Sequence, residues 1–97
     1  MKNNSILLED KEYEIIEDVR DGLDLDELKN KYTDFFYPYD YIVGDWAYGK
    51  LRLKGFYDDK NPIKKDINNI KNLKKYIDEN CAFNCKYFVV KKVYKNK

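Results

Sequence analysis

Hydrophobic residues near the start of the chain alternate imperfectly with polar ones in two short runs. The runs cover residues 5–9 and 13–19, and a polar turn near Asp10 separates them. Side chains of a strand point alternately to its two faces, so a period of two predicts a β-hairpin here. Gly22 lies in the break that follows the second strand.

The next segment has the spacing of an amphipathic helix. Its apolar side chains recur three or four residues apart, at Leu25, Leu28, Tyr32 and Phe35 or Phe36. This stripe predicts a helix to about residue 36 that packs against a sheet. Asp24 lies three residues before Glu27, which is the spacing of an N-terminal capping box. Pro38 ends the helix, because it disfavours the α conformation at the preceding residue.

Two further strands, a helix and a last strand are predicted in the remainder. Strand-like runs cover residues 41–45 and 50–57 around a short aromatic connection, and a polar turn follows at residues 58–62. A helix is predicted from about Asp66, and its apolar face is formed by Ile67, Ile70, Leu73 and Ile77. The last strand is expected over residues 86–94.

The order strand-strand-helix-strand-strand-helix-strand predicts an α+β fold. An antiparallel or mixed sheet of about five strands, with two helices packed on one face, would bury the apolar stripes of both helices. We expect residues 1–97 to form a single domain, because a chain of this length leaves no room for two. A domain of this size buries roughly 60 to 65% of its unfolded surface, so a deep active site is not expected.

The chain shows no segment expected to enter or cross a membrane. Its apolar runs are far shorter than the roughly 18 residues of a membrane-spanning helix. The N-terminal region has only three apolar residues in a row, Ile6–Leu8, before it turns acidic, which is unlike a signal peptide. We therefore expect a cytoplasmic protein.

Two cysteines and the absence of histidine narrow the available chemistry. A structural zinc site needs four nitrogen or sulfur ligands, so Cys81 and Cys85 could hold zinc only between two chains. Their C-x3-C spacing also differs from the C-x-x-C redox motif. In a reducing cytosol we expect two small apolar side chains at a helix-to-strand junction, and no metal or other cofactor. Whether the two cysteines pair stays open.

Charge is uneven along the chain, although the formal net charge is only +1. Residues 1–45 carry five basic and thirteen acidic side chains, whereas residues 46–97 carry fourteen basic and five acidic ones. The halves can neutralise one another across the folded surface, which is the simpler expectation. Alternatively they form an acidic and a basic face, which would favour a polyanionic partner.

The strand predicted over residues 50–57 is the strongest candidate for a binding surface. Alternation places Leu51 and Leu53 on one face, and basic and aromatic side chains on the other. The hairpin surface, as we define it, comprises Asp45, Trp46, Tyr48, Lys50, Arg52, Lys54 and Phe56. The simplest interpretation is a half-buried strand with a solvated basic face.

The residues for catalysis are not evident in the sequence. The loop from Gly44 to Gly49 has neither phosphate-binding glycine pattern, and its Asp45 can accept hydrogen bonds from the loop backbone. Without histidine, and with no evident base for the cysteines, nucleophilic catalysis has no visible machinery. Asp58 and Asp59 suit a turn better than an acid/base pair. We therefore expect that the protein is not an enzyme.

Two segments resemble a known family. Residues 39–57 read Y-D-Y-I-V-G-D-W-A-Y-G-K-L-R-L-K-G-F-Y and resemble the signature segment of the YutD-like proteins, small cytosolic proteins of low-GC bacteria. The C-terminal element of that family is similar to Cys81-x-Phe83-x-Cys85-x-Tyr87-Phe88-Val89. The resemblance implies a bacterial cytosolic protein and supplies no catalytic residue, because the family has no established activity.

One residue departs from the family pattern. Ala47 stands where the usual pattern has glycine. If this position requires a positive φ, the loop must differ or be strained.

Three functions are compatible with the sequence. The leading interpretation is a non-enzymatic binding or accessory protein that acts through the hairpin surface on an unknown protein or RNA partner. For a protein partner, Trp, Tyr and Arg are the usual anchors. The alternative is an RNA- or ribosome-binding protein, with Lys50, Arg52 and Lys54 on phosphates and the neighbouring aromatic rings on bases. A small-molecule enzyme would need a concave pocket with convergent polar groups. The partner and the oligomeric state stay open.

Overall fold

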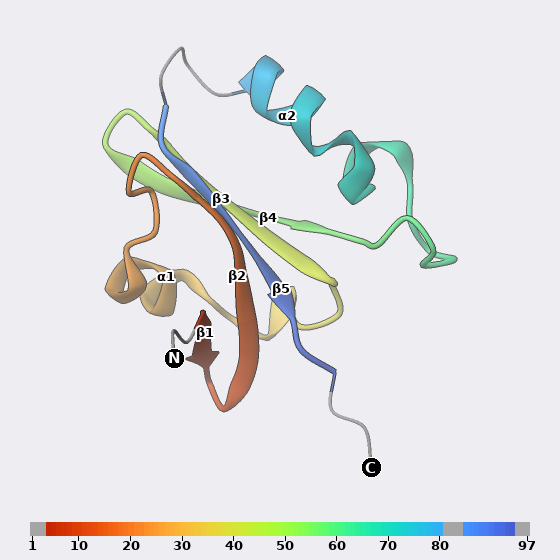
Figure 1. The fold of residues 1–97 in the computed structure, drawn as a ribbon, viewed down its shortest axis with the longest axis horizontal. Helices are drawn as coiled ribbons and strands as arrows, with labels where there is room; N and C mark the ends of the chain where they lie inside the picture. Colours follow the sequence, from red (N-terminus) through yellow and green to blue (C-terminus); the bar gives the residue numbers. More distant parts are fainter. Residues whose placement is uncertain (1–3, 81–84, 95–97) are drawn as a thin grey trace.

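A computed structural model of the chain describes residues 4–80 and 85–94 and shows one sheet with helices beside it (Figure 1). The strands are β1 (Ser5–Leu8), β2 (Lys11–Val19), β3 (Tyr41–Ala47), β4 (Lys50–Phe56) and β5 (Tyr87–Lys92). The helices are α1 (Leu25–Lys31) and α2 (Leu73–Asn80), with the 3-10 turns η1 (Asp34–Phe36), η2 (Asp66–Asn68) and η3 (Ile70–Asn72). The predicted α+β class and element order are confirmed.

The last strand lies in the centre of the sheet. The five strands follow the order β1-β2-β5-β3-β4, and every neighbouring pair is antiparallel. Phe88, Val89 and Val90 of β5 are all at most 2% exposed, so this strand is buried on both faces. The sheet is therefore continuous only through β5, which joins the β1–β2 hairpin to the β3–β4 hairpin.

The two helices cover opposite faces of the sheet, which corrects the prediction that both pack on one face. Successive residues Ile42 and Val43 of β3 belong to different apolar clusters, as do Val89 and Val90 of β5. Leu28 of α1 belongs to the first cluster, whereas residues of α2 pack against the second. The physical reason is that β3 and β5 are apolar at successive positions, so both faces need a cover.

The first core, between the sheet and α1, is the larger of the two. Its buried members are Leu8, Tyr13, Leu28, Tyr32, Ile42, Leu51, Phe88 and Val90. The second core has Val43, Phe56 and Val89 fully buried, with Ile70, Leu73, Tyr76 and Ile77 packed over them. Helix α2 contains no fully buried residue, so its side chains are less buried than those of the strands beneath it.

Both helical segments are shorter than the apolar spacing predicts. Asp24 caps α1 as predicted, because its side chain accepts a 3.1 Å hydrogen bond from the N–H of Glu27. The helix ends at Lys31, and the hydroxyl of Thr33 then accepts from a local N–H to begin η1. Asn69 does the same at the start of η3. Such local side-chain bonds compete with a continuous helix.

Two tight turns fix the register of both hairpins. Glu9 and Asp10 (φ 52° and 71°) join β1 to β2, and Tyr48 and Gly49 (φ 55° and 75°) join β3 to β4. Positive φ at both central residues is the type I′ geometry that matches the twist of paired strands. Ala47 lies in β3 and is not among the residues with positive φ, so alanine is accommodated without strain.

Within the described residues, no helix is long and apolar enough to cross a membrane. Cys81 lies outside the described residues, so the expectations for the cysteine pair stay predictions.

Candidate binding surface

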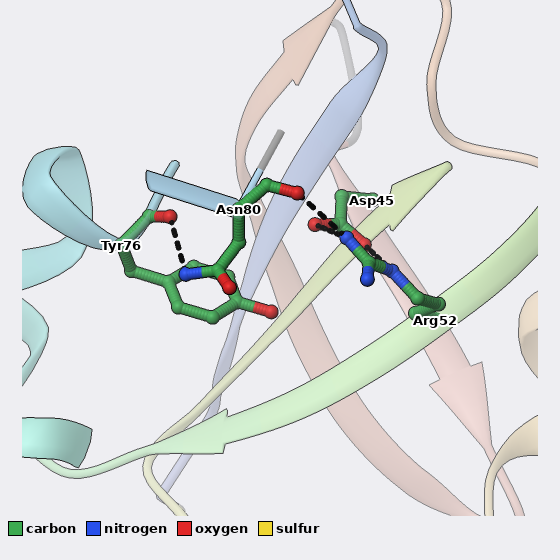
Figure 2. Close-up of polar contacts among 4 residues, drawn as sticks. All are labelled: Asp45, Arg52, Tyr76 and Asn80. Carbon is green, nitrogen blue, oxygen red and sulfur yellow. Dashed lines mark hydrogen bonds and ion pairs between the residues drawn. The ribbon is translucent and has the colours of Figure 1, made fainter. Parts of the chain in front are cut away.

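An ion pair joins the two strands of the β3–β4 hairpin. Asp45 and Arg52 are direct cross-strand partners, and the guanidinium donates from Nε and Nη2 to the two carboxylate oxygens at 2.9 Å each (Figure 2). Asp45 is only 1% exposed, whereas the Arg52 side chain is 45% exposed. This bidentate geometry satisfies a carboxylate that would otherwise be buried without a partner.

The same guanidinium also holds the end of α2. Arg52 Nη2 donates to the carbonyl of Asn80 at 2.9 Å, and the Asn80 side chain donates back to the Tyr76 carbonyl at 3.0 Å (Figure 2). A cation at a helix C-terminus is favoured by the helix dipole. Hydrogen bonding to Asp45 raises the pKa of the Arg52 guanidinium above its ordinary value. Arg52 is therefore an internal tie between two strands and a helix.

Trp46 connects the hairpin to the loop that precedes α1. Its Nε1 donates a 2.7 Å hydrogen bond to the carbonyl of Gly22, and its ring packs against the first core. The ammonium of Lys86 lies 4.9 Å from the ring centroid. Because the indole is half-buried and engaged at both its edge and its ring, it fixes the hairpin in place.

Phe56 and Lys54 face α2. Phe56 is 0% exposed, and its ring meets that of Tyr76 edge-on with centroids 5.5 Å apart. The Lys54 ammonium lies 5.3 Å from the Phe56 ring and 5.7 Å from the Tyr76 ring. The basic face of β4 is thus covered in part by α2 instead of being open to solvent.

Tyr48 and Lys50 occupy the exposed tip of the hairpin. Tyr48 is fully exposed, at 103% relative to a reference tyrosine, and Lys50 is exposed as well. The predicted hairpin surface is therefore reduced, because Asp45 and Phe56 lie in the interior. Tyr48, Lys50 and the outer parts of Arg52 and Lys54 remain accessible, and a binding role for them stays a prediction.

A second buried carboxylate, that of Asp40, has a structural role that was not predicted from the sequence. Asp40, just before β3, is 7% exposed and accepts hydrogen bonds from the Asp58 N–H at 2.7 Å and the Asn61 amide at 3.1 Å. The hydroxyl of Tyr94 donates to its other oxygen. Asp40 thereby ties the start of β3, the turn after β4 and the segment after β5. Its place between two tyrosines in the signature segment is the signal that could have drawn attention to it.

Comparison with known proteins identifies the chain's relatives. A family model described as "Putative antitoxin YutD-like" matches residues 7–91. "Putative antitoxin YutD" of Bacillus subtilis strain 168 is 46% identical over 90 residues, which are 93% of this chain and 99% of that protein. The chain belongs to the YutD-like family. The resemblance predicted from the two sequence segments is confirmed.

A solved YutD-like structure has the same fold. The solution NMR structure of protein yutD from B. subtilis matches with a TM-score of 0.81 and 42% identity, over 100% of this chain and 88% of that one.

The geometry explains much of the YutD-like signature as structure. A Cβ on Gly44 would lie 2.2 Å from the Phe88 ring, and one on Gly55 would lie 2.3 Å from the Tyr39 ring. Both glycines thus make room for an aromatic ring that packs on the strand. With the buried Asp45, the half-buried Trp46 and the turn residue Gly49, these positions serve the fold. The side chains of Tyr48 and Lys50 are the exposed part of the signature at the hairpin tip.

Proposed function

We propose that this chain is a non-enzymatic binding protein that holds a protein partner through the tip of the β3–β4 hairpin, with Tyr48 as the main anchor. One observation supports this most strongly. Tyr48 is a fully exposed aromatic residue in the left-handed conformation, at φ 55°.

The choice of tyrosine at this position is unfavourable for folding. Asn or Gly is preferred at the first central position of a type I′ turn, and other residues lose roughly 1 kcal/mol in the left-handed region. A fully exposed side chain gains little stabilisation from burial that could offset this cost. Glu9 has the same conformation in the β1–β2 turn, so it is the exposed ring of Tyr48, and not its φ alone, that favours contact with another molecule, since Tyr is among the residues that dominate protein interfaces.

The hairpin is also rigid, which favours binding. Its stem carries the bidentate Asp45–Arg52 pair, and the Trp46 indole bonds to the Gly22 carbonyl. A tip held in one conformation loses less entropy when it inserts into a partner. The name of the B. subtilis relative, "Putative antitoxin YutD", is compatible with a binding function.

The RNA-binding alternative has less support at this surface. The charge of Arg52 is matched by Asp45 at 2.9 Å, and Phe56 has no exposed ring for stacking. Trp46 is half-buried and already has Lys86 beside its ring. Only Tyr48 and Lys50 remain fully available for a base and a phosphate.

The substitution Tyr48→Asn separates folding from binding. Because asparagine suits the turn, the variant should be as stable as the wild type or more stable by up to about 1 kcal/mol, as measured by urea denaturation. Loss of an interface anchor should weaken partner binding roughly thirtyfold. Tyr48→Phe is the matched control, because it keeps the ring and should keep most of the affinity.

The partner would first be captured from a lysate of the native host with the wild-type chain and identified by mass spectrometry. Binding of the purified partner to the wild type and both variants would then be measured by calorimetry. Equal affinity of the wild type and Tyr48→Asn would refute the anchor role. Recovery of RNA instead of a protein, with the same sensitivity to Tyr48, would favour the RNA alternative.

A further inference from the structure

The connection between α2 and β5 begins and ends next to residues that contact the β3–β4 hairpin. Before it lies Asn80, the last residue of α2, whose carbonyl accepts the 2.9 Å hydrogen bond from Arg52 Nη2. After it lies Lys86, whose carbonyl accepts a 3.2 Å hydrogen bond from the Trp46 N–H. The ammonium of Lys86 also lies 4.9 Å from the centroid of the Trp46 ring. A change in this connection therefore acts on two contacts of the hairpin.

Both cysteines of the chain belong to this connection. Cys85 is disulfide-bonded and directly precedes Lys86. Cys81 directly follows Asn80 and lies outside the described residues. Because the sequence contains no third cysteine, a disulfide within one chain can join Cys85 only to Cys81. Such a bond closes residues 81–85 into a small ring between the two hairpin contacts.

Closing this ring restricts the C-terminal end of α2. A cross-link removes conformations that the unlinked chain can otherwise adopt. Helix α2 contains no fully buried residue, so burial holds its end less firmly than it holds the strands. Without the cross-link, Asn80 gains conformations in which its carbonyl does not reach Arg52. The central strand is different, because Phe88, Val89 and Val90 are at most 2% exposed and are held by burial in either state.

The surroundings of Cys85 favour a bond that forms and breaks over a permanent one. Cys85 is partly exposed, so a small thiol or disulfide can reach it. Both apolar cores are built from other residues, so the sheet does not need the bond in order to fold. The sequence predicts a cytoplasmic protein, and disulfides in that compartment are usually transient or redox-sensing.

We propose that Cys81 and Cys85 form a thiol–disulfide switch that sets how firmly the end of α2 is held against the β3–β4 hairpin. Oxidation joins the two sulfur atoms and releases two protons and two electrons, which a low-molecular-weight disulfide such as oxidised glutathione takes up as it becomes two thiols. In the oxidised state Arg52 stays bound to Asn80, and in the reduced state this bond opens more often. The switch does not depend on Tyr48, so its failure would leave the proposed function untouched.

Amide hydrogen exchange of the full chain, followed by NMR in the oxidised and the reduced state, tests this proposal. The amides of residues 77–80 should exchange roughly tenfold faster in the reduced chain, as expected for loss of a cross-link that closes a short loop. The amides of Val43 and Val89 are the internal control, because they lie in the buried part of the sheet and should exchange equally in both states.

The double substitution Cys81→Ser/Cys85→Ser provides the permanently reduced chain. It should exchange like the reduced wild type, and an oxidant should not change it. Thiol trapping and mass spectrometry in glutathione buffers then measure the reduced fraction of the wild type, which should change from mostly reduced to mostly oxidised within the cytosolic range of glutathione ratios. A wild type that stays oxidised or reduced throughout that range, equal exchange of residues 77–80 in both states, or a disulfide between two chains would overturn the proposal.

Discussion

At the scale of single residues, the buried carboxylate of Asp40 is held mainly by neutral donors. Burial acts to raise its pKa, but hydrogen bonds from Tyr94, the Asp58 N–H and Asn61, together with the charge of Lys92, outweigh burial. The pKa of Asp40 therefore lies below its ordinary value. The ionised form is the one that the folded structure stabilises.

This shift predicts how stability depends on pH at Asp40. A lowered folded-state pKa contributes stability that is present above the unfolded pKa of about 4 and is lost as the pH falls through the folded value. Asp40→Asn should therefore reduce the free energy of unfolding by roughly 1–3 kcal/mol at neutral pH. The difference in free energy of unfolding between Asp40→Asn and the wild type should shrink below about pH 4.

Urea denaturation over a pH series measures this difference. The exposed Asp34 provides a control, because Asp34→Asn should leave the pH dependence of the wild type nearly unchanged. A constant difference between Asp40→Asn and the wild type down to strongly acidic pH would show that the charge of Asp40 contributes nothing.

At the scale of secondary-structure elements, Arg52 provides a polar tie between the C-terminal end of α2 and the sheet. The helix buries no residue completely, and its end is fixed by the bond from Arg52 to Asn80. Loss of Arg52 would both free this end and leave the carboxylate of Asp45 buried without its partner. The second consequence is the more costly one.

The cost of an unpaired Asp45 can be measured with a double substitution. Arg52→Ala should destabilise the fold by about 2–3 kcal/mol, below the usual range for a wholly buried pair because the Arg52 side chain is 45% exposed. Asp45→Asn combined with Arg52→Ala should be more stable than Arg52→Ala alone, since no buried charge is left unpaired. Additive losses in denaturation experiments would contradict this account.

The elements themselves were largely predictable from the sequence, and their ends were not. Alternation and the spacing of apolar residues identified five strands and two helical segments in the right order. The early end of α1 and the late start of α2 follow from Thr33 and Asn69, whose side chains bond to nearby backbone N–H groups. Such competition between local bonds and a continuing helix is not visible in hydrophobic periodicity.

At the scale of the whole molecule, the acidic and basic halves of the chain are interleaved, because β5 lies between β2 and β3. Exposed acids and lysines also occur together on α1 and along η2, η3 and α2. Among the described residues, the ion pair between Asp45 and Arg52 connects the two halves, and Glu14 lies opposite Lys91 where β2 meets β5. The two halves thus meet within the sheet.

Strand order and the two covered faces could not be predicted, because both depend on contacts between distant segments. The insertion of β5 between β2 and β3 places residues 88–90 beside residues about 45 to 75 positions away. The burial of Phe56 requires α2 on its face of the sheet, and alternation alone cannot say which face of a strand a later helix will cover. For this reason the hairpin surface was predicted too large.

The most direct test of the central claim is photo-crosslinking from position 48 in cells of the native host. A photoreactive phenylalanine analogue would replace Tyr48, with the exposed Leu7 on β1 as the control position. We predict one discrete protein adduct from position 48 that is absent from the control. No adduct, an RNA adduct, or the same adducts from both positions would contradict the assignment of the hairpin tip as a protein-binding site.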